Sequence, residues 1–179
     1  MASLEKPMTD AARSSAPAID RVLIIDPNPP NAKLLGELLR GNRTGYQIHV
    51  AADAEQAWKM ADKISPQLIF IESKGPGLDG IAFIRELRRK QFSYREALVI
   101  MISVEATAAV ITGARDAGVH EFMRRPYTMG DLKKRLDAVL GRARAWIETE
   151  GYVGPDRRRF NAADYAGARR RRADKATAG

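Results

Sequence analysis

The chain has 179 residues, of which 45% are hydrophobic, and this length suits one domain of ordinary size with additional segments. The absence of cysteine excludes disulfide bonds, thiolate metal sites and cysteine nucleophiles. The net charge is +8, and residues 151–179, with eight basic and three acidic side chains, contribute +5 of it. No apolar run is long enough to cross a membrane and no secretory leader opens the sequence, so we expect a cytoplasmic protein without membrane insertion.

The predicted elements begin after an N-terminal arm. Residues 1–20 are rich in Ala, Ser and Pro and show no periodicity, which predicts a disordered arm. Short runs of branched apolar residues then alternate with segments of helical periodicity. Gly41 is expected to close the first helix, Asp53 to cap the second and Asp131 to cap the last. The predicted strands cover 22–25, 47–51, 68–71, 97–103 and 120–124, and a helix follows each of them.

Five apolar strands alternating with five helices predict an α/β fold, in which a parallel, doubly wound sheet is covered by helices on both faces. This domain is expected over 21–147, with a basic tail over 148–179. Functional groups of such sheets gather at the carboxyl ends of the strands. The basic residues of the third helix, Arg88 among them, are expected to form a solvated surface. The polar residues at the strand ends, which we expect to share one pocket, are Asp26, Glu72, Ser103 and Arg125.

Several segments of this domain resemble the CheY-like response-regulator receiver family over roughly residues 21–145. The resemblance implies a flavodoxin-like order of five strands and a phosphorylation pocket at their carboxyl ends. Residues 68–80 resemble the strand and loop that carry the phosphoacceptor, and residues 101–104 resemble the segment that carries the switch hydroxyl. The other matching segments are Leu23–Pro29, which resembles the first strand and its acid pair, and Ala117–Tyr127, which resembles the last strand and its Lys-Pro pair.

The chain departs from the family pattern at three positions of the pocket. Family members have a second carboxylate, an aspartate phosphoacceptor and a lysine where this chain has Pro27, Glu72 and Arg125. A Mg²⁺ ion needs nearly octahedral oxygen ligands, and a displacement near 1 Å can slow group transfer roughly 100-fold. We therefore predict a non-catalytic pseudo-receiver that neither binds Mg²⁺ usefully nor accepts a phosphoryl group, with no other metal site.

Two interpretations of the altered pocket stay open. In one, Glu72 extends a permanent negative charge towards Ser103 and Arg125 and so imitates the phosphorylated state. In the other, Glu72 and Arg125 form a structural ion pair, a role that suits the planar, two-pronged guanidinium. Ser103 is either a switch hydroxyl or the cap of the following helix.

The tail contains a short internal repeat. Each unit has a Tyr, any residue, a Gly, a small or cyclic residue and then three Arg, with one extra Asp before the arginines of the first unit. The two Tyr lie 13 positions apart. Arginine pairs in bidentate fashion with phosphate and with the O6 and N7 atoms of guanine, and aromatic rings stack on bases. A cyclic dinucleotide with two guanines and two phosphates meets these demands with the required twofold symmetry. The candidate cyclic di-GMP ligands are Tyr152, Arg157, Arg158, Arg159, Tyr165, Arg169, Arg170, Arg171 and Asp174.

A receiver with such a tail resembles the Cle group, CheY-like regulators that bind cyclic di-GMP through an arginine-rich C-terminal extension. The resemblance implies that the ligand folds the tail and that the complex docks at the flagellar motor switch, at the flagellated pole, to tune motility and surface attachment. One alternative is a phosphorelay regulator that uses Glu72 or Ser103 unconventionally. Another is a basic tail that contacts RNA or acidic lipid or has no specific ligand. Nucleic acid is less favoured, because generic basic tails mix Lys with Arg and lack ordered aromatic spacing.

Overall fold

The computed structural model describes residues 19–141 and 144–159. Nearly all of the predicted N-terminal arm therefore lies outside the described residues. So does the second arginine cluster of the tail, residues 169–171. None of the helices in this part of the chain is both long and apolar enough to cross a membrane.

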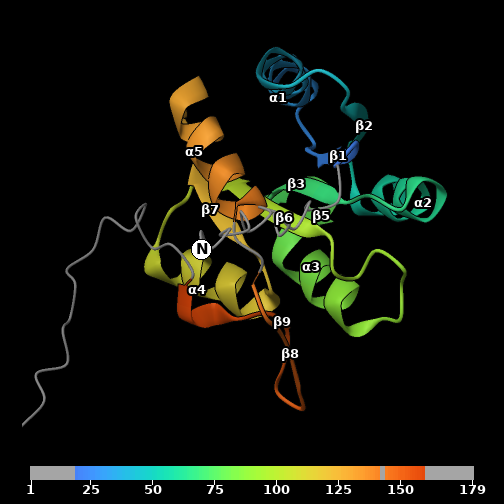
Figure 1. Ribbon diagram of the computed structural model, residues 1–179, viewed down its shortest axis with the longest axis vertical. Coiled ribbons are helices and arrows are strands. Elements are labelled where there is room, and N and C mark those ends of the chain that lie inside the picture. Colours follow the sequence, from blue (N-terminus) through green and yellow to red (C-terminus); the bar gives the residue numbers. More distant parts are fainter. Residues whose placement is uncertain (1–18, 142–143, 160–179) are drawn as a thin grey trace, which may run out of the picture.

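A five-stranded parallel sheet forms the centre of the molecule, as the sequence predicts. The strands lie in the order β2-β1-β3-β6-β7, and all neighbours are parallel. The chain first adds β2 on one side of β1 and then adds the later strands on the other side, and ligands of such sheets bind at the switch point between β1 and β3. Figure 1 shows these strands in one layer between the helices. The strands are β1 (Arg21–Ile25), β2 (Gln47–Ala51), β3 (Leu68–Glu72), β6 (Leu98–Ser103) and β7 (Glu121–Arg124), and the helices are α1 (Pro29–Asn42), α2 (Ala54–Ile64), α3 (Gly80–Arg89), α4 (Ala108–Ala117) and α5 (Met129–Leu140).

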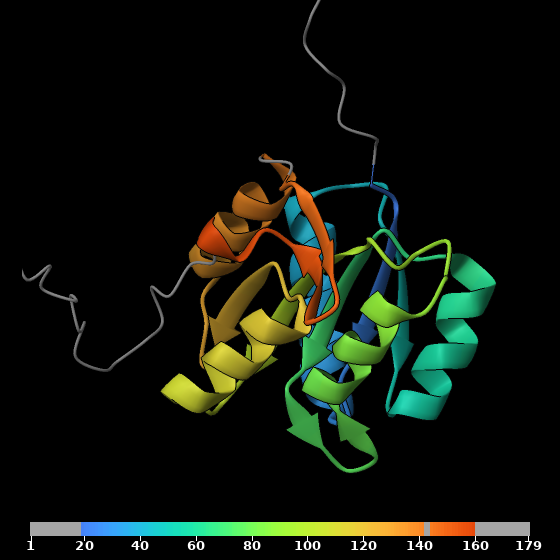
Figure 2. The ribbon, with the colours of Figure 1, turned by 90° about the horizontal axis from the view of Figure 1, so that it is seen from below.

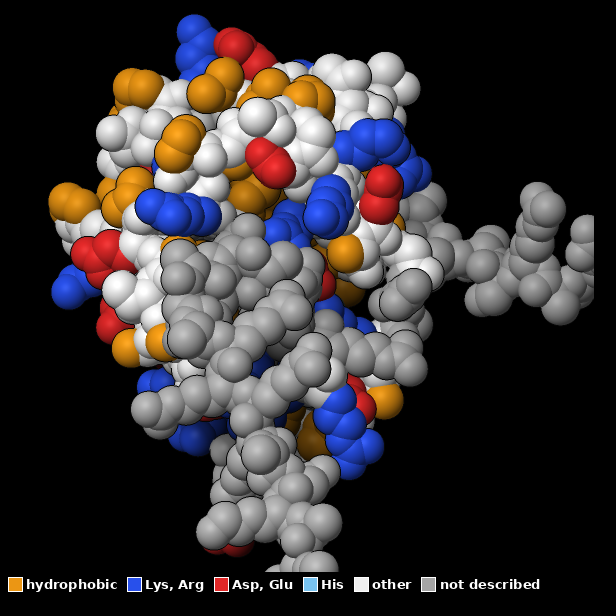
Figure 3. All heavy atoms as spheres, turned by 90° about the vertical axis from the view of Figure 1, so that its left-hand side faces the viewer, with side chains coloured by type: hydrophobic (Ala, Val, Ile, Leu, Met, Phe, Trp, Pro, Cys, Tyr) orange, Lys and Arg blue, Asp and Glu red, His pale blue; other side chains and the backbone are white. Residues whose placement is uncertain are grey.

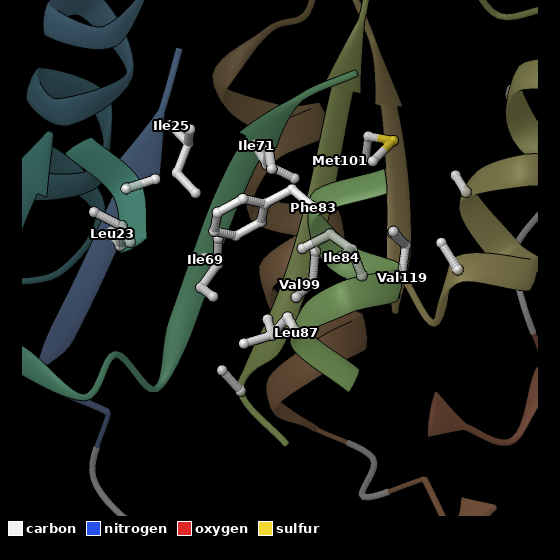
Figure 4. Packing of buried hydrophobic residues seen from close by; sticks show 14 of the residues in the cluster. Leu23, Ile25, Ile69, Ile71, Phe83, Ile84, Leu87, Val99, Met101 and Val119 are labelled. Atoms are coloured by element: carbon white, nitrogen blue, oxygen red, sulfur yellow. The ribbon is translucent and has the colours of Figure 1, made fainter. Parts of the chain in front are cut away.

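The apolar core has two halves because successive strand residues point to opposite faces of the sheet. Leu23 and Ile25 pack with α2, α3 and α4, whereas Val22 and Ile24 pack with α1 and α5. Figure 4 shows the first half, in which the Phe83 ring of α3 lies beside Ile69 and Ile71 of β3. Burial on both faces explains why the strands read as unbroken apolar runs.

The helix ends agree with the sequence in part. Asp53 caps α2 as predicted, since its carboxylate accepts from the Gln56 N–H at 2.8 Å. Gly41 lies inside α1 instead of closing it, because the helix continues to Asn42. The cap of α5 is Thr128, with Asp131 as the third residue of a capping box, and Thr107 caps α4 in place of Ser103. In α4 and α5, a threonine hydroxyl three or four residues from the predicted position therefore provides the cap.

Two antiparallel ribbons accompany the sheet. The shorter ribbon, β4 (Lys74–Gly75) with β5 (Leu78–Asp79), lies at the carboxyl edge of the strands. The longer one pairs β8 (Trp146–Thr149) with β9 (Tyr152–Pro155) and leads into a 3₁₀ turn at Arg157–Arg159. Figure 2 shows the β8–β9 hairpin, in orange, lying against α4 and α3, the helices that β9 contacts. Residues 148–159 thus belong to the folded unit, beyond the expected boundary after Ile147.

Close backbone approach fixes the hairpin on the domain. An added Cβ on Gly118, after α4, would lie 3.1 Å from the carbonyl oxygen of Val153 in β9. An added Cβ on Gly154 would lie 3.0 Å from the Cα of Gly118, and φ is +154° at that residue. Both glycines are therefore required where the two backbones meet. The Gly of the first tail repeat serves this contact.

Candidate functional site

The four predicted pocket residues all lie at the carboxyl edge of the sheet. Asp26 follows β1, Glu72 and Ser103 end β3 and β6, and Arg125 follows β7. Because β1, β3, β6 and β7 are consecutive neighbours in the sheet, parallel pairing brings these ends together.

Arg125 joins the two carboxylates of the pocket. Its Nη2 donates to Asp26 Oδ2 at 2.6 Å, and its Nη1 donates to Glu72 Oε2. The side chains of Arg125, Asp26 and Glu72 are only 13%, 5% and 11% exposed. One guanidinium thus neutralises part of a nearly buried pair of negative charges. The structure contains the Glu72–Arg125 ion pair and extends it to a third member.

Further hydrogen bonds use the remaining carboxylate oxygens. Asp26 Oδ1 accepts from the Asn28 N–H at 2.8 Å, and Glu72 Oε1 accepts from the Ser73 N–H at 3.0 Å. Beside the cluster, burial raises the pKa of the Tyr127 hydroxyl, and Arg125 offsets part of that rise. Each carboxylate is therefore held at both oxygens by groups of the chain itself.

Ser73 is a pocket residue that the sequence analysis missed. Its hydroxyl lies 2.7 Å from Ser103 Oγ and 3.2 Å from Glu72 Oε1, and so it connects the two. Ser103 Oγ also accepts from the Glu105 N–H at 3.0 Å. Strand alternation places adjacent residues on opposite sides, and the residue after Glu72 is brought beside it only by the turn of the backbone at the end of β3.

The first arginine cluster of the tail, Arg157–Arg159, lies against α4. Arg157 donates to Asp116 of α4 at 3.0 Å, and its guanidinium carbon lies 4.3 Å from the centre of the Tyr152 ring. Tyr152 is 6% exposed, and its hydroxyl donates to the Pro155 carbonyl at 2.6 Å inside the hairpin. Burial raises the pKa of this hydroxyl. The expectation that this ring stacks on a nucleobase is therefore corrected, because the ring is buried. Tyr152 instead anchors the start of the tail.

The other candidate ligands are described only in part. Arg158 is exposed, and its backbone N–H donates to Asp156 Oδ1 at 3.0 Å. Arg159 ends the 3₁₀ turn. Tyr165, Arg169, Arg170, Arg171 and Asp174 lie outside the described residues.

Comparison with known proteins identifies the family. The response regulator receiver domain matches residues 22–137, which is well over half of the chain. The chain belongs to this family. It is 30% identical to the transcriptional regulatory protein PdtaR of Mycobacterium tuberculosis over 148 residues, covering 82% of this chain and 68% of PdtaR. It is 27% identical to the probable chemotaxis protein CheY of Rhizobium etli over 122 residues, covering 68% of this chain and 92% of that protein.

Solved receiver structures share the fold. Chemotaxis protein CheY4 of Vibrio cholerae aligns with a TM-score of 0.62 and 24% identity, over 69% of this chain and all of CheY4. The receiver domain of the sensor histidine kinase PA1611 of Pseudomonas aeruginosa aligns with a TM-score of 0.61 and 25% identity, over 70% of this chain and all of that domain. That domain holds a magnesium ion coordinated in its active site cleft.

The residues of this receiver do not suit a magnesium ion. Mg²⁺ requires oxygen ligands in octahedral geometry, and here Pro27 stands where the family has a second carboxylate. The Pro27 ring packs against Gly75 of β4, where an added Cβ would lie 2.7 Å from Pro27 Cγ. The two remaining carboxylates already bind the Arg125 cation. Within the described ranges, no group of three or more acidic, His or Cys side chains is arranged to hold a metal.

Proposed function

We propose that this chain is a non-catalytic receiver protein that responds to cyclic di-GMP instead of phosphorylation and docks a protein partner. The observation that carries the proposal is the bridge from Arg125 to both Asp26 and Glu72, which occupies the carboxylates that a metal ion and a phosphoryl group would need. The tail repeat then supplies the input that the pocket lacks. The likeness to the Cle group makes the flagellar motor switch the partner to test, with motility and surface attachment as the output.

The energetics of the pocket support the first part of this proposal. Phosphorylation would require Arg125 to leave at least one carboxylate that is almost fully buried. Breaking a buried ion pair by removing one partner costs about 3–5 kcal/mol. A phosphoryl group would also carry nearly two negative charges into a pocket that already holds the two nearly buried carboxylates of Asp26 and Glu72. The pocket is therefore suited to the single charge state in which Arg125 is paired with Asp26 and Glu72, and not to a change of charge by phosphorylation.

The charge distribution supports the second part. On the side of the molecule drawn in Figure 3, the Lys and Arg side chains of the described residues are scattered among acidic and apolar ones, without forming one continuous patch. The tail, by contrast, places seven Arg within residues 157–172. Each Arg can pair in bidentate fashion with a guanine or a phosphate. In this proposal, Tyr152 anchors the tail, and the ligand contacts come from Arg157, Arg158, Arg159, Tyr165, Arg169, Arg170, Arg171 and Asp174.

Calorimetric titration of the full chain with cyclic di-GMP tests the proposal. The variant R169A/R170A/R171A should bind the dinucleotide at least about tenfold more weakly, since hydrogen bonds to charged groups contribute roughly 1.5–3 kcal/mol each. The matched control K33A/R40A/R85A removes three exposed positive charges from helices of the domain and should change the affinity less than twofold.

Two results would overturn this assignment. The first is the absence of binding by the unaltered chain. The second is equal affinity for cyclic di-GMP and single-stranded RNA, with a steep dependence on salt, which is the behaviour of non-specific attraction to phosphates.

A further inference from the structure

A second pocket lies at the opposite edge of the sheet from the phosphorylation pocket. Its volume is about 780 Å³, and residues preceding or beginning β1, β3, β6 and β7 line it together with Leu140 of α5 and Trp146 of β8. In Figure 2 this is the end of the sheet where β1 begins, away from the β4–β5 ribbon. The volume falls in the range of small-molecule sites, about 300–1,000 Å³. Among the described residues, none that belongs to the receiver pocket or to the first tail repeat lines this space.

A buried positive charge lies beside this pocket, and the Glu96 carboxylate of the pocket wall offsets only part of the cost of burying it. Arg88 of α3 is 1% exposed, which corrects the expectation that it belongs to a solvated face. Its guanidinium donates to the carbonyls of Ala97 at 2.9 Å and Gly118 at 3.0 Å, and Trp146 lies over it at 5.4 Å. Within the described residues, no carboxylate lies at ion-pair distance from it. Burial accordingly lowers the pKa of Arg88 to about 9.

Arg144 adds a second cation to the wall of the pocket. Its side chain is 9% exposed, and its Nη2 donates to Glu121 Oε1 at 2.6 Å. Glu121 also accepts from Arg135 of α5. Burial, and after it the positive charges of Arg88 and Arg144, lower the pKa of His120, which lines the same pocket. Arg21, Arg43 and Arg144 line the pocket against a single carboxylate, that of Glu96, so the lining favours an anion.

Among the described residues of this wall, two hydrogen-bond donors are buried without a hydrogen-bond partner. They are Nη1 of Arg144 and Nε1 of Trp146, both from residues that line the pocket. A buried donor left unsatisfied costs about 1–3 kcal/mol, and such groups in native structures require an explanation. An anionic oxygen is the kind of partner that both donors lack, since guanidinium and indole N–H groups can only donate.

We propose that this pocket binds a nucleotide-sized anion, namely a phosphate joined to a planar aromatic ring. The phosphate accepts from Arg144 and Trp146, with Arg43 at the rim adding a further positive charge. The ring packs against Tyr94 and the apolar residues of the wall, since aromatic and aliphatic side chains form most of such a site. No lining residue of this site comes from residues 148–159, and the proposal does not rest on the response to cyclic di-GMP.

Trp146 provides the reporter for a test. The chain has two tryptophans, and W58F leaves Trp146 as the only one while keeping an aromatic ring against Phe83. Full-length W58F is titrated with GMP, and guanosine and inorganic phosphate serve as separate probes for the two halves. GMP should change the Trp146 fluorescence saturably, with a dissociation constant at least about tenfold lower than that of either half.

Variants then locate the binding. In the W58F background, R144Q should weaken GMP at least tenfold and R43Q severalfold, whereas R89Q, on the exposed side of α3, should have no effect. R43Q alters an exposed side chain, so it stays informative if R144Q unfolds. Absence of a saturable GMP response overturns the proposal, as does unchanged affinity in R43Q. Loss of GMP binding in R169A/R170A/R171A also overturns it, because the signal would then come from the tail.

Discussion

Replacing Arg125 by Gln removes the cation between two nearly buried carboxylates. Because Asp26 and Glu72 are 5% and 11% exposed, water cannot replace the lost partner without opening the pocket. Loss of one partner from a buried pair costs about 3–5 kcal/mol, and two carboxylates are left facing each other here, so we expect R125Q to lose at least about 3 kcal/mol. For a domain of this size, that corresponds to a melting temperature lower by about 6–12 °C.

Urea unfolding followed by circular dichroism at pH 7.5 measures this loss. Arg124 is the matched control, since it is adjacent and exposed, and R124Q should stay within about 0.5 kcal/mol of the unaltered chain. The reasoning about the pocket is refuted if R125Q is as stable as R124Q, because the bridge would then contribute nothing.

Three further predictions concern the receiver chemistry, a buried histidine and the hairpin. Acetyl phosphate with Mg²⁺ should leave the unaltered chain unlabelled and should label P27D/E72D/R125K, which restores the family pattern; a label on the unaltered chain would contradict the proposed function. Burial lowers the pKa of His120 below its usual 6.5. As the pH falls through 6.5, His120 is therefore protonated in the unfolded chain before it is protonated in the folded chain. The free energy of unfolding accordingly decreases below about pH 6.5. Between pH 7.5 and 5.5 the unaltered chain should therefore lose about 1.4 kcal/mol more than H120N in urea titrations, and equal slopes would argue against this role. G154A should destabilise the chain by about 1–3 kcal/mol, because φ is positive at Gly154 and the Gly118 backbone is close. G151A has open space around the added methyl group and should leave the stability unchanged. Urea unfolding measures both, and equal stability of the two variants would contradict the packing of the hairpin.

The sheet and the primary pocket follow from local patterns in the sequence. Apolar runs such as Val22–Ile25 predict buried strands because both faces of the sheet are covered. Parallel pairing then places Asp26, Glu72, Ser103 and Arg125 at one edge without any knowledge of side-chain contacts. The second partner of Arg125, which is Asp26, depends on side-chain geometry that periodicity does not contain.

The hairpin and the buried arginine beneath it could not be predicted in the same way. Residues Trp146–Pro155 follow the last helix and precede the arginine cluster, so composition assigns most of them to the tail. The turn falls at Glu150–Gly151, a pair that is a weaker hairpin signal than Asn-Gly or Asp-Gly and says nothing about packing against α3 and α4. Arg88 lies four residues after Ile84, on the inner stripe of α3, but its burial requires the hairpin that covers it. Long-range packing, which no local pattern encodes, decides both features.

The most direct test of the central claim is calorimetry with cyclic di-GMP on the full chain and on a chain that ends at Arg159. The shorter chain keeps the β8–β9 hairpin and its contact with α4, so it retains the described fold while losing the second arginine cluster. The account predicts saturable binding by the full chain and a loss of at least about tenfold in the shorter one. Equal binding by both chains, or binding by neither, would contradict it.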